Sequence, residues 1–310
     1  MNNSSPQTNL SIIGAPTDIG ASLRGSCMGP EALRVAHIEK RLTEMGYRVK
    51  DRRNLSGPLN PEEEPQGGFR HLKETLAWAK MTRDAVTGIL KDGDLPIILG
   101  GDHSVSMGSI SAVAHHCKQQ KKPLMVFWLD AHTDFNTKHT TPTYNTHGMA
   151  VSMLCGVNNE ELLSIGYETP VLQTDQVVFI GIRSVDPLEL KLVRENGMAV
   201  FDMQTIDKHG MDYVMDGALE KAKKLKAHIH VSFDLDFLDP YVAPGVGTCV
   251  HGGVTFREAR LCMERIYESG LFGSLDITEL NPALDHKNKT AKIAATLVES
   301  LFGRKYPDQY

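Results

Sequence analysis

The chain has 310 residues, of which 41% are hydrophobic, and a formal net charge of -5 at pH 7. This length and apolar content suffice for a full core, and the acidic balance argues against a protein that binds nucleic acid by basic charge. No apolar run approaches the roughly twenty residues that a membrane-spanning helix needs, and the 5 cysteines form no CxxC pair, which argues against a disulfide framework and a zinc–thiolate site.

The chain begins with a polar segment, MNNSSPQTNL, that has neither the basic region nor the apolar core of a secretion signal. We therefore predict a loose N-terminus over residues 1–9 and a cytoplasmic protein with reduced cysteines. The candidate site residues lie far apart in the sequence and must meet in one place. For this reason we expect a single domain over residues 10–305.

Seven apolar runs along the chain are typical of buried strands. They cover residues 10–16, 96–101, 125–130, 177–183, 198–203, 228–234 and 272–278. Helical patterns alternate with them, among them an amphipathic stretch over residues 74–93 and a closing segment with Ile293, Leu297 and Leu301 at helical spacing. The alternation predicts an α/β fold with a parallel sheet and helices on both faces, and the Pro-, Gly- and Glu-rich residues 54–69 predict a surface loop.

Carboxylates and imidazoles cluster directly after three of these runs. The clusters are Gly-Gly-Asp-His103, Asp130-Ala-His132-Thr-Asp134 and Asp234-Leu-Asp236. Because alternate side chains of an extended segment point the same way, Asp130, His132 and Asp134 are expected to converge, as are Asp234 and Asp236. Sites form at the carboxyl ends of strands in open α/β sheets. The clusters therefore predict one metal site.

The composition of this site indicates which metal it binds. Four aspartates and two histidines, with no cysteine among them, form a hard, oxygen-rich ligand set that suits Mn²⁺ better than structural Zn²⁺. Six ligands overfill one tetrahedral centre, whereas bridging carboxylates can hold two ions roughly 3.5 to 4 Å apart around a shared water that becomes hydroxide near neutral pH.

Each of these aspartates taken alone could be a turn or N-cap residue. Several of them buried together without a partner would be costly, so the pattern favours a bound cation. Asp102 lies outside the alternating register; it either orients the neighbouring histidine or caps a turn.

The motifs GGDHS, DAHTDFN, HGM, SFDLDFLDP and DITELNP, in this order and at these separations, resemble those of the ureohydrolase family, and most of all its arginases. The resemblance covers the chain from about Leu10 to Phe302. It implies a three-layer α/β/α sandwich around an eight-stranded, mainly parallel sheet, and assembly into a homo-oligomer, a trimer or a hexamer. It also implies hydrolysis of the guanidino group of L-arginine to L-ornithine and urea by a metal-bridging hydroxide.

The same resemblance implies two Mn²⁺ per chain and assigns their ligands. One ion would be bound by His103, Asp130, Asp134 and Asp234, and the other by Asp130, His132, Asp234 and Asp236.

Three further residues match catalytic positions of the family. His147 could shuttle protons, and either it or Asp134 would assist protonation of the leaving amine. Glu279 matches the carboxylate that pairs with the planar guanidinium of the substrate. The alternatives are a satisfied loop histidine for His147 and a plain strand-end glutamate for Glu279.

The remaining matches concern the amino-acid end of the substrate. Asn136 and Thr143 match positions that contact the α-carboxylate, Asp186 matches one near the α-ammonium, and Glu189 and Thr248 are further candidate contacts. Each could be an ordinary loop residue. Together they favour an amino acid over an amine such as agmatine, which lacks the α-carboxylate.

Other functions remain open from the sequence. An agmatinase or another guanidino-acid hydrolase would use the same chemistry on a different substrate. A metal-dependent deacetylase would use one Zn²⁺ and would not need both the DxHxD and the DxD motif. A catalytically silent relative would usually have lost ligands, whereas this chain retains them all.

Overall fold

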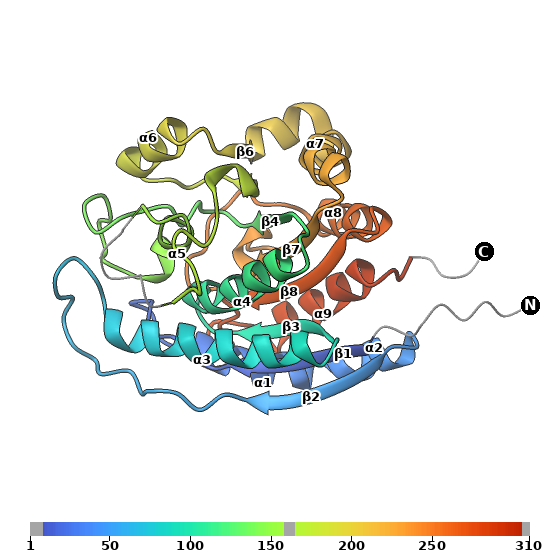
Figure 1. Ribbon diagram of the computed structural model, residues 1–310, viewed down its shortest axis with the longest axis horizontal. Helices are drawn as coiled ribbons and strands as arrows, with labels where there is room; N and C mark the ends of the chain where they lie inside the picture. Colours follow the sequence, from blue (N-terminus) through green and yellow to red (C-terminus); the bar gives the residue numbers. More distant parts are fainter. Residues whose placement is uncertain (1–8, 158–164, 306–310) are drawn as a thin grey trace, which may run out of the picture.

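The computed structural model describes residues 9–157 and 165–305, and its centre is an eight-stranded sheet (Figure 1). The strands are β1 (Asn9–Ala15), β2 (Arg48–Asn54), β3 (Leu95–Gly100), β4 (Leu124–Leu129), β5 (Val177–Ile182), β6 (Ala199–Asp202), β7 (His228–Asp234) and β8 (Phe272–Thr278). Their order is β2-β1-β3-β8-β7-β4-β5-β6, and every neighbouring pair is parallel. The predicted α/β fold with a mainly parallel sheet is confirmed.

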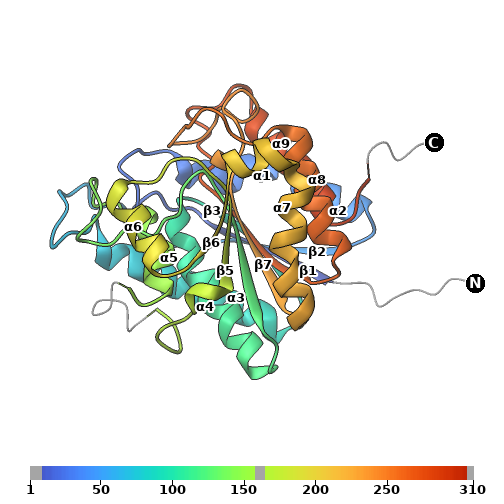
Figure 2. The same ribbon diagram turned by 90° about the horizontal axis from the view of Figure 1, so that it is seen from above.

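Nine α-helices in the described residues cover the two faces of the sheet. They are α1 (Gly29–Val35), α2 (Ile38–Glu44), α3 (Leu72–Lys91), α4 (Ser106–Gln119), α5 (Ala150–Leu154), α6 (Pro187–Glu195), α7 (Met203–Leu225), α8 (Phe256–Glu268) and α9 (Lys289–Leu301). Figure 2 shows α3 to α6 on one side of the sheet and the other five helices on the opposite side. This is the expected three-layer sandwich, and α3 and α9 are the two helices expected from periodicity.

Two apolar clusters lie between the layers and explain why most strands read as continuous apolar runs. Phe127 and Leu129 of β4 pack toward α7, α8 and α9, whereas Val126 and Trp128 of the same strand pack toward α3, α4 and α5. A strand that is buried on both faces has no polar side to reveal its period of two.

We did not predict β2, because its residues carry no apolar strand pattern. Its residues, RVKDRRN, are mostly charged and half-exposed, because β2 lies at the edge of the sheet and pairs only with β1. Asp51 of this strand forms an ion pair with Arg34 of α1 at 2.8 Å. A charged edge of this kind opposes association with the edge of another sheet.

The ends of the chain and its longest loop partly match expectation. Residues 1–8 of the predicted loose N-terminus lie outside the described residues, and Asn9 already belongs to β1. The segment from Leu55 to α3 contains no helix and no strand beyond an isolated bridge between Gln66 and Phe69, as expected for a surface loop. None of the helices in residues 9–157 and 165–305 combines the length and apolar character that crossing a bilayer requires.

The glycine pair Gly100–Gly101 at the end of β3 permits a close crossing of two backbones. Asp102 N donates to Thr17 O at 2.9 Å, and Glu279 N donates to Gly101 O at 2.8 Å. A Cβ at Gly101 would lie 1.7 Å from the carbonyl oxygen of Thr17, which cannot move without displacing the loop after β1. Only glycine therefore fits beside the turn that carries His103.

We expect Gly101→Ala to lower the free energy of unfolding by about 3 kcal/mol or more, because the clash involves backbone on both sides. Gly88→Ala in α3 is the matched control, since its Cβ would meet nothing within 4 Å. That control should gain up to about 1 kcal/mol from helix propensity. Urea denaturation midpoints measure both, and an unchanged midpoint for Gly101→Ala would contradict the close crossing.

Candidate metal centre and substrate pocket

The acidic residues and histidines of the three clusters meet at the carboxyl ends of the four central strands. These strands, β3, β8, β7 and β4, are neighbours in the sheet. The cluster residues that lie at or just after their ends are His103, Asp130, His132, Asp134, Asp234 and Asp236, with Glu279 following β8. Apart from His132, all are buried.

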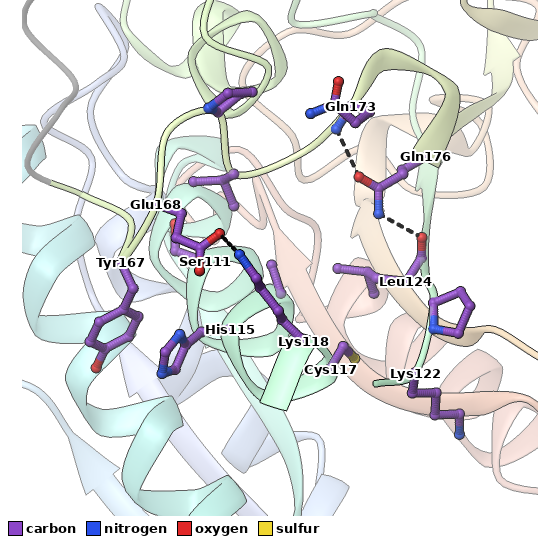
Figure 3. Close-up of a pocket in the computed structure, with 14 residues that line it drawn as sticks. Ser111, His115, Cys117, Lys118, Lys122, Leu124, Tyr167, Glu168, Gln173 and Gln176 are labelled. Atoms are coloured by element: carbon purple, nitrogen blue, oxygen red, sulfur yellow. Dashed lines mark hydrogen bonds and ion pairs between the residues drawn. The ribbon is translucent and has the colours of Figure 1, made fainter. Parts of the chain in front are cut away.

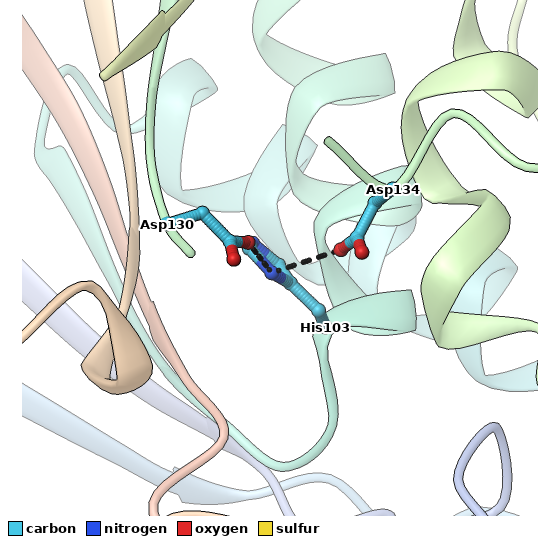
Figure 4. Close-up of side chains that lie close together, drawn as sticks. All are labelled: His103, Asp130 and Asp134. Carbon is cyan, nitrogen blue, oxygen red and sulfur yellow. Dashed lines mark ion pairs between the residues drawn. The ribbon is translucent and has the colours of Figure 1, made fainter. Parts of the chain in front are cut away.

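The first group forms around the imidazole of His103. Its Nδ1 lies 3.0 Å from Asp130 Oδ2, 3.2 Å from Asp134 Oδ2 and 3.0 Å from Asp234 Oδ2. Figure 4 shows Asp130 and Asp134 approaching the ring of His103. His103, Asp130 and Asp134 offer ligand atoms close enough to hold one ion.

The second group shares one carboxylate with the first. His132 Nδ1 lies 3.3 Å from Asp130 Oδ1 and 3.0 Å from Asp236 Oδ2, and these three residues could also hold an ion. Asp130 thus directs one oxygen toward each group. A carboxylate placed in this way is suited to bridge two cations.

The predicted reason for this convergence, alternation along a strand, is wrong. β4 ends at Leu129, so Asp130 to Asp134 lie in the loop beyond it, and Asp134 has a left-handed φ of 45°. Asp234 caps a 3₁₀ turn (Leu235–Phe237) and accepts from Asp236 N at 2.7 Å. The turns direct His132 and Asp134 into different groups, which a straight strand would not do.

The hydrogen bonds of His103 test whether the site fits a cation. Ser232 Oγ donates to Asp276 Oδ1 at 2.6 Å, so it can only accept from His103 Nε2, which lies 2.9 Å away. Nδ1 is then the ring nitrogen that faces the carboxylates, and this buried atom has no hydrogen-bond partner among the described residues. Such a nitrogen among three carboxylate oxygens is stable only if a positive charge, on the ring itself or on a cation bound there, lies between them. The donor set therefore fits a divalent cation.

The carboxylates lie so close together that they cannot all be ionised unless positive charge lies among them. Burial, and then the charges of Asp236 and Asp130, raise the pKa of Asp234 well above its usual range. Burial opposes ionisation of Asp130 as well, but His103 and His132 lower its pKa. Such divergent pKa values within one cluster are characteristic of sites that bind cations or carry out proton chemistry.

Asp102 caps a turn and does not orient His103. Its side chain accepts from Ser104 N at 3.0 Å, from Ser104 Oγ and from Gly20 N at 2.7 Å. The capping alternative is therefore correct, and Ser232 is the residue that contacts the outer nitrogen of His103. We did not predict Ser232, although the alternation of polar and apolar residues in HIHVSFD was a signal for it.

His147 and Glu279 form an ion pair beside the first group. His147 Nδ1 lies 2.8 Å from Glu279 Oε1, which also accepts from His103 N at 2.7 Å. Burial lowers the pKa of His147, but Glu279 outweighs it and the pKa rises to about 9. In turn His147 lowers the pKa of Glu279 despite its burial. Glu279 Oε2 accepts no hydrogen bond from the residues that the structure describes.

A cavity of about 230 Å³ opens above the metal groups. Its lining includes Asp134, Asp234 and His147 together with the five predicted contacts for the amino-acid end of the substrate, which are Asn136, Thr143, Asp186, Glu189 and Thr248. The sequence therefore identified residues from four separate segments that line one cavity. Glu279 is buried and pairs with His147 of this lining.

Two of these residues, Asn136 and Glu189, already form hydrogen bonds within the chain through most of their polar atoms. Asn136 Nδ2 donates to Asp186 Oδ2 at 2.9 Å and to Glu189 Oε2 at 3.1 Å. Glu189 Oε1 accepts from Thr133 Oγ1 at 2.5 Å and from Phe135 N at 2.9 Å, and burial raises the pKa of Glu189 to about 7. Asn136 and Glu189 thus fix Asp186 and the loop after β4, and Asp186 is the more accessible acid.

A second cavity, of about 240 Å³, lies at the opposite end of the sheet (Figure 3). It is bounded by the end of α4, the start of β4 and residues 167–176. Lys118 and Glu168 pair with each other across it, and Tyr167 stacks on His115. Among the described residues that line it there is no carboxylate cluster, and its one glutamate, Glu168, is already paired, so the cavity above the carboxylates is the better candidate for chemistry.

Comparisons with known proteins agree with this choice. The chain matches the Arginase family over residues 8–303. It is 41% identical to the arginase of Bacillus subtilis strain 168 over 297 residues, which cover 96% of this chain and 98% of that protein. It is 42% identical to the arginase of Agrobacterium fabrum over 299 residues, which cover 96% and 92% of the two chains. The structure of the arginase from Bacillus caldovelox superposes with a TM-score of 0.92 at 39% identity, covering 97% of this chain and 100% of that one.

Proposed function

Because the chain belongs to the arginase family, we infer that it hydrolyses the guanidino group of L-arginine to L-ornithine and urea. The observation that supports this most strongly is the cavity in which the buried carboxylate and imidazole groups lie beside Asp186 and Thr143. An amino-acid substrate offers an α-ammonium and an α-carboxylate to such polar groups. The alternatives, an agmatinase, a deacetylase and a silent relative, are not favoured.

We propose that the family's metal requirement is met here by two Mn²⁺ per chain. His103, Asp130, Asp134 and Asp234 would hold one ion, and Asp130, His132, Asp234 and Asp236 the other. The oxygen-rich donor set and the shared position of Asp130 support this assignment. When bound, such cations act as Lewis acids that make water acidic enough to serve as a nucleophile at neutral pH.

The protein's own groups orient the substrate and move protons. Glu279 Oε2 would accept from the guanidinium and hold its carbon beside the metal groups. Water adds to that carbon, and the C–N bond to the side-chain nitrogen of ornithine then breaks. The leaving nitrogen takes a proton, for which His147 is suited because its Nδ1 is paired with Glu279 and its Nε2 remains to exchange a proton. Asp134 is the second candidate for this step.

The test is urea release from L-arginine, agmatine and 4-guanidinobutyrate by the Mn²⁺-loaded protein, with a chelated control. We expect chelator-sensitive turnover that strongly prefers L-arginine. A preference for agmatine would show that Asn136, Thr143 and Asp186 do not recognise an amino acid. Absence of urea from all three substrates would refute the proposed function.

We expect Asp186→Asn to lower kcat/KM for L-arginine about 10- to 100-fold, because one charge-assisted hydrogen bond to the α-ammonium contributes about 1.5–3 kcal/mol. Asp186 also caps α6, and asparagine caps as well as aspartate, so the helix should persist. 4-Guanidinobutyrate carries the guanidino group but no ammonium, so it is the internal control. An equal loss for both substrates would contradict this role of Asp186.

Three further predictions are proposals about the protein as a whole. We propose a single domain over residues 10–305, a trimeric or hexameric assembly and a cytoplasmic location. Light scattering on the eluting protein measures the assembly, and fractionation of cells measures the location.

A further inference from the structure

One face formed by the neighbouring strands β7 and β8 carries polar side chains, although it is buried. Ile229, Val231 and Phe233 of β7 pack into the apolar cluster beneath α7 to α9. The alternate residues of the same strand, His228, His230 and Ser232, lie on the opposite face beneath α4. The paired strand β8 places Ser274 beside His230 and Asp276 beside Ser232. Except for His228, which is 8% exposed, these polar residues have no exposed surface.

These side chains form one hydrogen-bonded chain, which we call the polar ladder: His228, Ser274, His230, Asp276, Ser232 and His103. His228 Nε2 and His230 Nδ1 each lie 2.8 Å from Ser274 Oγ, and His230 Nε2 lies 2.9 Å from Asp276 Oδ2. At the other end, Ser232 Oγ joins Asp276 Oδ1 to His103 Nε2 at 2.6 and 2.9 Å. The polar ladder therefore ends on a residue of the first metal group.

The direction of each bond follows from Asp276, because an ionised carboxylate can only accept. Ser232 Oγ, His230 Nε2 and, from α4, Ser109 Oγ at 2.6 Å all donate to it. Because the hydroxyl hydrogen of Ser232 is donated to Asp276, the oxygen of Ser232 must accept the hydrogen bond from His103 Nε2. The negative charge of Asp276 thus fixes which nitrogen of His103 carries a proton, although the two residues do not touch.

A network of this kind is costly unless it is complete, because each buried polar group without a partner costs about 1–3 kcal/mol. Apolar residues would fill the same positions at less risk, as they do on the other face of β7 and on both faces of β4. A role for the polar ladder in holding His103 explains why these strands carry it.

We propose that Asp276, acting through Ser232, is a positioning residue for metal binding: it keeps His103 protonated at Nε2 and directs Nδ1 toward the carboxylates. This inference rests on the proposed function, in which His103 holds a cation. It assigns to Asp276 and Ser232 a role that neither their burial nor their pairing in the sheet requires, and Ser109 of α4 supports that role as a further donor to Asp276.

The experiment compares the parent with Ser232→Ala, Asp276→Asn and Ser109→Ala. Ser111→Ala is the matched control, because Ser111 is a buried serine of α4 whose hydroxyl donates to Met107 O and takes no part in the polar ladder. Calorimetric titration of each metal-free protein with Mn²⁺ gives the affinity of each cation. Circular dichroism and denaturation midpoints verify folding.

We expect Ser232→Ala and Asp276→Asn to lower the binding affinity for one of the two cations about 10- to 100-fold, as is typical when a residue that contacts a metal ligand is replaced. The other cation, which His103 does not contact, should change much less, whereas general destabilisation would weaken both. In the Co²⁺-loaded parent, the Nε2 proton of His103 should give a shifted, slowly exchanging NMR signal that Ser232→Ala removes. Ser111→Ala should match the parent in both measurements.

The results of this experiment distinguish failure of the positioning role from failure of the proposed function. If the parent binds no Mn²⁺, the proposed function fails. If the parent binds two ions and Ser232→Ala and Asp276→Asn bind them equally well, only the positioning role fails. Should Asp276→Asn not fold, Ser109→Ala removes a single donor from Asp276 and should weaken the same cation by a smaller factor; unchanged affinity in Ser109→Ala and Ser232→Ala together would overturn the proposal.

Discussion

Asp130→Asn is expected to reduce urea release from L-arginine by about 10³-fold or more, because cations supply several kcal/mol of charge stabilisation and each 1.4 kcal/mol is tenfold in rate. Asp130 directs Oδ2 to His103 and Oδ1 to His132, so it belongs to both metal groups. Asparagine has nearly the same shape and keeps one oxygen, so the loss reports on charge and coordination rather than on a cavity. Metal analysis of the dialysed variant should find less than the parent's content.

Asp202→Asn is the control for this substitution. Asp202 is the last residue of β6 and also lies at the carboxyl end of the sheet, but it caps α7 and accepts from Thr205 N at 2.8 Å. Asparagine is an equally good cap, so activity and metal content should stay at the parent level. A variant Asp130→Asn that kept a tenth of the parent's activity with full metal content would exclude a bridging role for this carboxylate.

The fold could be predicted where one residue type dominated a segment. The seven apolar runs were sufficient for seven strands. Burial on both faces explains the continuous apolar signal of the central strands, whereas the edge strand β6 was found from its apolar residues although they are not buried. β2, at the other edge, could not be found in this way, because its own residues are mostly charged and only its pairing with β1 identifies it. The prediction of a single domain over residues 10–305 stays a prediction.

The residues that form the site could be predicted better than the arrangement of their side chains. Aspartates and histidines at the ends of neighbouring parallel strands converge whatever the local backbone does, so the cluster was found from the sequence. Which oxygen faces which histidine depends on the turn at Asp134 and the 3₁₀ turn after Asp234. Such turns are set by contacts between distant segments. The role of Ser232 likewise depends on Asp276, 44 residues away in the chain.

Glu279→Gln is expected to lower kcat/KM about 10²- to 10³-fold while both cations remain bound, since losing one partner of a buried charged pair costs about 2–5 kcal/mol. Glu279 accepts from His103 N and pairs with His147 through Oε1, which leaves Oε2 for the guanidinium. Glutamine keeps an oxygen for the backbone contact but loses the charge that attracts both His147 and the substrate.

The pattern across substrates separates Glu279 from the other residues of the site. The guanidinium is common to L-arginine and 4-guanidinobutyrate, so Glu279→Gln should lower kcat/KM equally for both. Asp186→Asn should lower kcat/KM only for L-arginine, and Asp130→Asn should reduce the metal content. Glu258→Gln, in the capping box of α8, is the matched control, because glutamine serves in that box as well as glutamate. Activity of Glu279→Gln within threefold of the parent on L-arginine would mean that the guanidinium is held elsewhere. The cavity would then have to bind its substrate in the reverse orientation, with Asp186 facing the guanidinium.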